Sequence, residues 1–286
     1  MTEASRRTIL TAFATAAVGT TALAETATAA PGTAHATGAV AAPAAVAEPE
    51  SHTEIYTNTA LVEGRDYSRR FRRADPNLAP HFTRTTVMAI HGGGIEPGTS
   101  ELCLGIAGFH TSPVAPAGRD GLPLHDYWMF EGRKTSGNAD AFHVTSSKAD
   151  DRVALSMAGS SLNVVSVHGC DWQGVTTPDN KQAVVVGGLN VPFKNLLKAQ
   201  LTAAGFQVID GAGTNLAGEQ PNNICNRTIL RMGAQLELTG ELRAAMFTVN
   251  TGAGRATSTT QVFHDFVAAT RKAIHLQEQA PEQIVH

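Results

Sequence analysis

The chain has 286 residues, of which 42% are hydrophobic and 16% are charged, and its formal net charge is −3. This length is sufficient for a sizeable hydrophobic core. The small net charge excludes a protein that holds nucleic acid by bulk electrostatic attraction. Beyond the N-terminus no apolar stretch is long enough to span a bilayer, so we expect no membrane span in the mature chain.

Residues 1–24 have the layout of a twin-arginine export signal. Arg6 and Arg7 precede a mildly apolar segment rich in Ala, Thr and Val, and Ala22-Leu23-Ala24 offers a small-x-small cleavage site. This pattern predicts a secreted or extracytoplasmic protein exported by the twin-arginine route.

Residues 25–54 are rich in Ala, Thr and Pro and contain few large apolar side chains. Such a segment cannot bury enough surface to fold, so it is predicted to be a disordered linker or pro-region. We therefore expect a single folded domain over residues 55–286.

The first strong structural signal is a strand, a glycine turn and a helix start. Residues 85–90 form a β-branched apolar run, His91-Gly92-Gly93-Gly94-Ile95-Glu96 follows, and residues 98–102 have a helix-start pattern. Ligands in open α/β sheets bind beyond the carboxyl ends of strands. His91 and Glu96 therefore suit two ligands of a His₂Glu zinc site. They equally suit a glycine-rich turn with a locally hydrogen-bonded His and a solvated Glu.

A second apolar strand, predicted over residues 163–167, also ends in His-Gly, at His168. A histidine at a strand end is often only hydrogen-bonded there. Together, His91, Glu96 and His168 would form an open site for one zinc ion per chain, with water as the fourth ligand.

The remaining elements alternate between strand and helix patterns. This alternation predicts an α/β fold, a three-layer sandwich with a mixed, largely parallel sheet. A Pro- and Gly-rich surface loop is expected over residues 107–125. Further strands are predicted at 183–186, 206–209 and 234–238, and helices at 192–201 and about 258–276.

Glu237 is the candidate catalytic carboxylate. It lies between Leu236 and Leu238 in a predicted strand, so its side chain points away from their face. A metal-bound water needs such a group as general base and proton shuttle. Glu101 is the rival, although a carboxylate in the first turn of a helix also stabilises that helix.

Three residues are candidates for substrate binding. Arg227 and Asn226 lie in a polar loop, where a guanidinium could hold a substrate carboxylate through two hydrogen bonds; an exposed surface turn is the alternative. His143, in a segment 141–146 whose alternation predicts a strand, could face the substrate or have a structural role.

The three cysteines, Cys103, Cys170 and Cys225, do not suggest a disulfide framework. Cys170 and Cys225 both fall in candidate site loops, where one disulfide could form in an exported protein. All three equally suit small buried apolar residues.

Six ordered blocks between about Tyr56 and Phe247 resemble the zinc-dependent poly-γ-glutamate hydrolase family, known from bacteriophages with relatives in bacteria. The blocks are residues 89–96 with 98–101, 130–132, 142–146, 167–169, 223–227 and 233–238. Two parts depart from the phage pattern: the segment between Leu102 and Tyr127, and the C-terminal helix. These departures bear on the predicted substrate more than on the predicted metal site.

The resemblance implies a zinc-carboxypeptidase-like fold and hydrolysis of γ-linked amide bonds in poly-γ-glutamate. It also implies that His91, Glu96 and His168 hold the zinc and that Glu237 is the catalytic carboxylate. The alternatives are hydrolysis of γ-linked glutamate bonds in peptidoglycan peptides and a non-catalytic module that binds an anionic polymer. A serine esterase is disfavoured, because the chain contains no Gly-x-Ser-x-Gly motif. The oligomeric state is left open.

Overall fold

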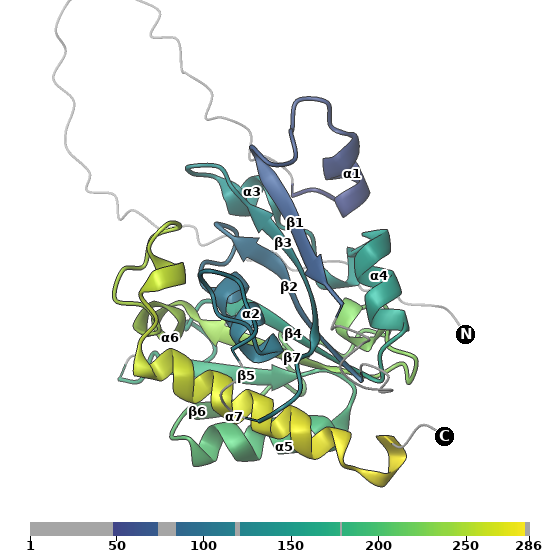
Figure 1. Ribbon diagram of the computed structural model, residues 1–286, viewed down its shortest axis with the longest axis vertical. Coiled ribbons are helices and arrows are strands. Elements are labelled where there is room, and N and C mark those ends of the chain that lie inside the picture. The colour runs from purple at the N-terminus through teal and green to yellow at the C-terminus, as the bar shows by residue number, and fades with distance from the viewer. Residues whose placement is uncertain (1–47, 74–83, 118–120, 178, 284–286) are drawn as a thin grey trace, which may run out of the picture. The chain divides into compact units, whose positions relative to one another are not determined.

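A seven-stranded sheet in the order β1-β3-β2-β4-β7-β5-β6 forms the centre of the fold in the computed structural model, which describes residues 48–73, 84–117, 121–177 and 179–283 (Figure 1). The four strands β2, β3, β4 and β7 are parallel, β1 and β5 pair antiparallel to their neighbours β3 and β7, and β6 is parallel to β5. The predicted mixed α/β sheet is therefore confirmed. The strands are β1 (Tyr67–Arg72), β2 (Thr85–Gly93), β3 (Asp126–Gly132), β4 (Asn163–Cys170), β5 (Ala183–Gly187), β6 (Gln207–Asp210) and β7 (Ala234–Thr239).

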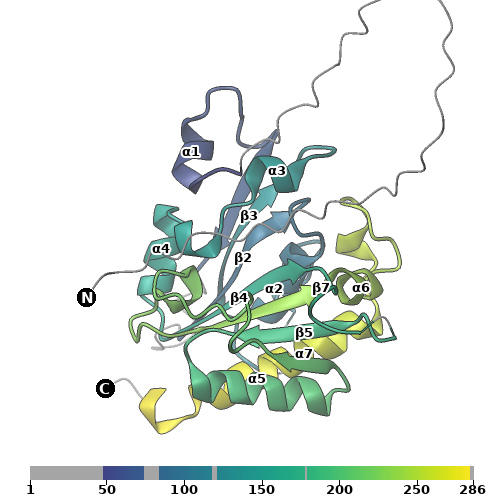
Figure 2. The ribbon, with the colours of Figure 1, turned by 180° about the vertical axis from the view of Figure 1, so that it is seen from behind.

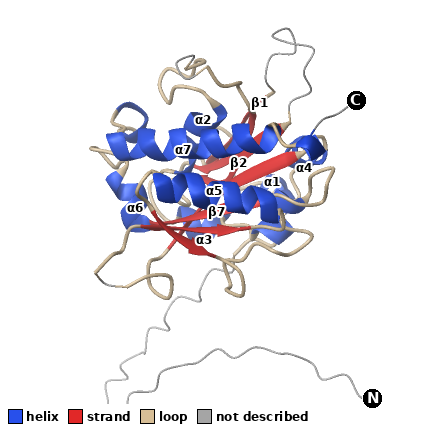
Figure 3. Ribbon diagram, turned by 90° about the horizontal axis from the view of Figure 1, so that it is seen from below, coloured by secondary structure: helices blue, strands red, loops and turns tan. Residues whose placement is uncertain are grey.

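Helices cover both faces of the sheet and give three layers. Helices α2 (Thr99–Ala107), α5 (Val191–Ala203), α6 (Gly240–Ala245) and α7 (Gln261–Glu278) contribute to one apolar cluster. Helices α1 (His52–Thr57), α3 (Asn138–Phe142) and α4 (Arg152–Gly159) contribute to the other. Figure 2 shows α1, α3 and α4 beside the β1–β3 end of the sheet, and Figure 3 shows α5 and α7 lying next to each other.

Period-two alternation assigns the strand side chains to the two clusters. Val87 and Ala89 of β2 pack with α2 and α7, whereas Met88 and Ile90 pack with α3 and α4. The runs of β2 and β5 are mostly apolar because strands covered on both faces of a sheet are buried on both faces. The predicted strands at 85–90, 163–167, 183–186, 206–209 and 234–238 and the two long helices form, with bounds shifted by a few residues.

One predicted strand is wrong, and the structure has further elements that the sequence patterns did not predict. The segment 141–146 alternates in sequence, but Ala141 and Phe142 end the short helix α3, and Ser146 begins a 3-10 turn, η2 (Ser146–Lys148). The sequence patterns did not reveal β1, β3, α1, α3, α4 and α6. Helix α1 begins at His52, inside the segment expected to be a linker, whereas residues 1–24 and 25–47 lie outside the described residues.

The connection between β4 and β5 begins and ends at the same edge of the sheet. Strand β4 is parallel to β7 and β5 is antiparallel to β7, so residues 171–182 leave and re-enter the sheet at the carboxyl ends of β4 and β7. Within the described part of the chain, no helix has the length and apolar character needed to cross a bilayer.

Candidate metal centre

The glycine turn after β2 is shaped by close contacts on all sides. A Cβ atom on Gly92 would lie 2.5 Å from Ser100 Oγ, and one on Gly94 would lie 2.5 Å from Asn138 Nδ2, while Gly93 has φ +66°. Only glycine tolerates this combination of crowding and left-handed backbone. The Glu96 amide donates to the His91 carbonyl at 2.9 Å, which closes the turn and returns Glu96 to the end of the strand.

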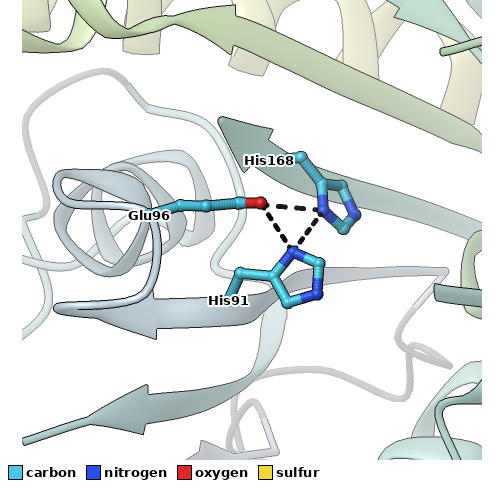
Figure 4. A group of neighbouring side chains, drawn as sticks. All are labelled: His91, Glu96 and His168. Atoms are coloured by element: carbon cyan, nitrogen blue, oxygen red, sulfur yellow. Dashed lines mark hydrogen bonds and ion pairs between the residues drawn. The ribbon is translucent and has the colours of Figure 1, made fainter. Parts of the chain in front are cut away.

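The turn brings His91 and Glu96 together with His168 from the neighbouring strand (Figure 4). His91 Nδ1 lies 2.8 Å from Glu96 Oε1 and 3.1 Å from His168 Nδ1, and His168 Nδ1 lies 3.8 Å from Glu96 Oε2. Two ligands of one tetrahedral zinc, each about 2.0–2.1 Å from the ion, lie roughly 3.3 Å apart. The three separations bracket this value, so the side chains have the spacing of a ligand set.

The outer nitrogen of each imidazole is already occupied. His91 Nε2 is 2.9 Å from the Val144 carbonyl oxygen, which can only accept, so Nε2 carries the proton. With the proton on Nε2, Nδ1 carries a lone pair, which points towards the Glu96 carboxylate and the His168 imidazole. His168 Nε2 likewise contacts Ser166 Oγ at 2.7 Å. Such outer contacts fix the tautomer of metal-binding histidines. If Ser166 Oγ accepts from His168 Nε2, then His168 Nδ1 is also an acceptor, and the three inner atoms together suit a cation.

The pKa shifts agree with a neutral imidazole beside an ionised carboxylate. Burial, reinforced by His91, lowers the pKa of His168 to about 3. Burial alone would raise the pKa of Glu96, but His91, His143 and His168 together lower it below its ordinary value. Glu96 Oε2 also accepts from the Gly169 amide at 2.7 Å. The residues therefore fit a divalent metal ion.

Glu237 lies next to this group, on β7. It pairs with His168 in the β4–β7 register, and Leu236 and Leu238 pack on the opposite face, as the alternation predicts. Gln235 Nε2 donates to Glu237 Oε1 at 2.8 Å, and Asn223 Nδ2 donates to Gln235 Oε1 at 2.9 Å. Burial and the nearby Glu96 carboxylate raise the pKa of Glu237 well above its ordinary value.

The rival Glu101 instead faces Arg255, with Oε2 3.5 Å from Arg255 Nε.

Two arginines that the sequence patterns did not single out support the site. Arg243 of α6 donates to the Pro97 and Leu238 carbonyl oxygens, and its guanidinium lies where a Cβ of Gly169 would be. Arg255 Nη2 donates to the Gly93 carbonyl oxygen at 3.1 Å. No local motif marks either residue, because each acts on a segment that is distant in sequence.

His143 is part of the site. Its ring stacks on His91 with centroids 4.0 Å apart, and its Nε2 lies 3.7 Å from Glu96 Oε1. Hydrogen bonding to Glu96 raises the pKa of His143. The ring is partly exposed, so it extends from the ligands towards the surface.

Asn226 and Arg227 have other positions. Asn226 is buried, and its amide bonds only to backbone, at Gly218, Gln220, Leu189 and Gly233. Arg227 is exposed and lines a cavity of about 340 Å³ with residues from 221 to 231, none of which is a candidate ligand. Their predicted role in substrate binding stays a prediction.

The three cysteines are free. Cys103 and Cys225 are buried and Cys170 is half-buried at the end of β4. Of the two arrangements left open by the sequence, the structure has unpaired thiols.

Comparison with known proteins identifies the family. Residues 57–269 match the family model described as poly-gamma-glutamate hydrolase. The chain belongs to this family. The resemblance seen in the six sequence blocks is thereby confirmed.

Relatives of this family member include two proteins of Bacillus subtilis (strain 168). The chain is 32% identical to the SPbeta prophage-derived protein YoqZ over 193 residues, which cover 67% of this chain and 62% of YoqZ. It is 32% identical to the protein YndL over 222 residues, which cover 74% of this chain and 79% of YndL.

Two solved structures are similar to this family member. A bacteriophage poly-gamma-glutamate hydrolase has a TM-score of 0.65 and 26% identity, covering 80% of this chain and 97% of its own. The zinc-free form of YndL has a TM-score of 0.64 and 26% identity, covering 80% and 98%. The fold is therefore shared with a phage enzyme, as the sequence resemblance implied.

Proposed function

We propose that this protein is an exported, zinc-dependent hydrolase that cleaves γ-glutamyl amide bonds, with poly-γ-glutamate as its substrate. The observation that carries the proposal is the convergence of His91, Glu96 and His168 beside a separate carboxylate, Glu237. Family membership supports the substrate class. The similar structure of YndL is a zinc-free form of that protein, which supports zinc as the metal.

Each residue has a distinct role in the proposed reaction. Zinc held by His91, Glu96 and His168 would polarise the scissile carbonyl and lower the pKa of an attacking water towards about 7. Glu237 takes the proton from that water and returns it to the leaving amine. Its Oε1 is held by Gln235, and Oε2 makes no hydrogen bond within the described residues, so Oε2 is the atom that carries the proton.

The environment of Glu237 suits this role. A proton carrier works best when its pKa lies near the working pH, and burial together with Glu96 moves the pKa of Glu237 upwards. The Asn223–Gln235–Glu237 chain of hydrogen bonds fixes the orientation of the carboxylate, so little reorganisation is needed when the proton moves.

Export is proposed from the sequence. The twin-arginine pattern of residues 1–24 and the Ala-, Thr- and Pro-rich segment that follows support a secreted location. Fractionation of cells that express the full chain tests this part, and substitution of Arg6 and Arg7 by lysine should retain the protein inside the cell.

The activity is tested by metal analysis of the purified protein together with a viscosity assay on poly-γ-glutamate, before and after chelation. We expect one zinc per chain and a loss of viscosity that stops on chelation. If the protein binds zinc but does not cleave the polymer, the metal site would be supported, and peptidoglycan peptides would be tested as the substrate instead. Absence of metal, with no activity after zinc is added, would refute the hydrolase.

A further inference from the structure

An acidic segment of the chain lies against the outer side of the candidate metal centre. Glu48 Oε2 is 3.5 Å from His143 Nδ1, and the other ring nitrogen of His143 is 3.7 Å from Glu96 Oε1. A single imidazole ring thus separates the Glu48 carboxylate from a candidate ligand. The segment therefore lies at His143, the partly exposed member of the site.

A second carboxylate of the same segment meets a second cation. Glu50 forms an ion pair with Lys148 Nζ. Lys148 ends η2, four residues after Val144, whose carbonyl oxygen accepts from His91. His143 and Lys148 therefore present two nitrogen groups to two carboxylates along one side of the site.

The direction of the acidic segment is fixed by the helix that follows it. Ser51 caps α1 through its hydroxyl, and the Thr53 amide donates to Asp150 Oδ1 at 3.0 Å, two residues beyond Lys148. Pro49 restricts Glu48 to extended backbone. The anchored start of α1 therefore directs the segment towards His143 and Lys148, where Glu48 and Glu50 form their ion pairs.

The sequence separation of these two carboxylates can be compared with the repeat of a γ-linked chain. Side chains two residues apart in an extended peptide are about 6.6 Å apart along the chain. A γ-linked glutamate has five backbone atoms where an α-linked residue has three, so its repeat is about 6 Å, with one free carboxylate in each repeat. Successive carboxylates of the polymer therefore have nearly the spacing of side chains two residues apart in an extended peptide, which is the sequence separation of Glu48 and Glu50.

We propose that His143 and Lys148 form a carboxylate subsite for two successive residues of a γ-linked glutamate chain, and that Glu48 and Glu50 occupy this subsite in the free protein. The inference rests on the proposed function, because it names the groups that recognise the same substrate. The acidic segment acts as an internal competitor.

The competitor is weakly held, which lets a substrate displace it. The side chains of Glu48 and Glu50 are 62% and 76% exposed, and ion pairs this exposed contribute little and are screened by salt. A polymer that offers many carboxylates can bind at many positions along its length, and its first contact makes the next one intramolecular.

The test measures binding of poly-γ-glutamate to the full chain carrying Glu237→Gln, so that turnover does not interfere, at low ionic strength. Lys148→Met should weaken binding about fivefold. Lys198→Met is the matched control, since it removes the same charge from a lysine paired with Asp210 on α5 and β6, and it should leave binding unchanged. If Lys148→Met and Lys198→Met change the affinity for the polymer equally, Lys148 does not form part of a carboxylate subsite.

The second arm removes the competitor. Glu48→Gln with Glu50→Gln should tighten binding two- to fivefold, and this gain should disappear when Lys148→Met is also present. Asp265→Asn with Glu282→Gln removes two exposed charges elsewhere and controls for net charge. If the two double variants gain the same affinity for the polymer, or if the gain persists when Lys148→Met is present, Glu48 and Glu50 do not compete for the subsite.

The two proposals fail in distinguishable ways. Failure of the wild-type chain to cleave the polymer would refute the proposed function, and the binding measurement would still decide the subsite. Cleavage by the wild-type chain combined with Lys148-independent binding would refute the subsite alone.

Discussion

Glu237 lies directly beside His168 across the parallel strands β7 and β4. One strand pair therefore carries both a candidate ligand and the candidate proton carrier, and their separation is set by backbone hydrogen bonds rather than by a loop. Ser166 and Gln235, two pairs earlier in the same register, contact His168 and Glu237 respectively.

Replacement of Glu237 by Gln should abolish turnover while leaving the metal bound. The amide keeps the size of the side chain but cannot carry the proton, so we expect kcat to fall by about 10²–10⁴-fold. The measurements are kcat on the polymer and zinc content per chain. Glu241→Gln, on α6 just beyond the same strand, is the control. Wild-type turnover in Glu237→Gln would remove Glu237 from the mechanism.

Replacement of Ser166 by Ala should weaken metal binding without unfolding the protein. It removes the contact at His168 Nε2, and loss of such outer contacts typically costs about 10–100-fold in metal affinity. Competition with a chromophoric chelator measures the effect, and Ser156→Ala on the exposed side of α4 is the matched control. Identical zinc affinities in the two variants would show that Ser166 does not orient His168.

Introduction of a methyl group at Gly169 should destabilise the site. An alanine Cβ would lie 2.5 Å from Arg243 Cζ and 2.6 Å from its Nη2, so Arg243 would have to leave the carbonyl oxygens of Pro97 and Leu238. Overpacking of this kind costs about 1–3 kcal/mol. Thermal unfolding and activity should both fall in Gly169→Ala. Gly252→Ala, which has open space around it, should behave as wild type, and equal stability of the two variants would contradict this packing.

Stability should decrease on acidification through His52. This residue is fully buried among Trp128, Phe130 and Tyr56, and burial lowers its pKa to about 4. The unfolded chain binds the proton below about pH 6.5 and the folded chain only below about pH 4. The unfolded state therefore holds more protons in this window, and the free energy of unfolding falls as pH drops through it, by up to about 3 kcal/mol.

The variant His52→Phe isolates this contribution. Denaturant midpoints measured from pH 7 to pH 4 should have a shallower slope in His52→Phe than in wild type, because the two proteins differ only at His52. His264→Phe, at an exposed position of α7, should retain the wild-type slope. Parallel curves for His52→Phe and wild type would show that His52 does not titrate with unfolding.

The parts of the fold that sequence patterns predicted are those with long apolar periodicity. The central strands β2, β4 and β7 are buried on both faces, and their apolar or alternating residues predict strands directly. Edge strand β1 contains Arg69, Arg70 and Arg72, which pair with acidic groups or contact rings across the sheet edge, so it has no apolar pattern. The five-residue helix α3 is too short to show a helical period, which explains the mistaken strand at 141–146.

The site residues that could be predicted are those that lie at the carboxyl end of a predicted strand. His91, Glu96 and His168 each lie at or just beyond the carboxyl end of a strand, so topology alone brings them together. Ser166 and Val144 were not predictable as partners, since a serine within a strand and a backbone carbonyl 53 residues from His91 carry no local signal. Lys148 depends in the same way on contacts between distant segments.

The reversal of direction between β7 and β5 has an evolutionary consequence. Because residues 171–182 start and finish at the same edge of the sheet, insertions or deletions there leave the register of every strand intact. The ligand-bearing strands and this neighbouring connection can therefore diversify at different rates. Substrate preference could drift among descendants of one ancestor while the metal-binding chemistry is inherited unchanged.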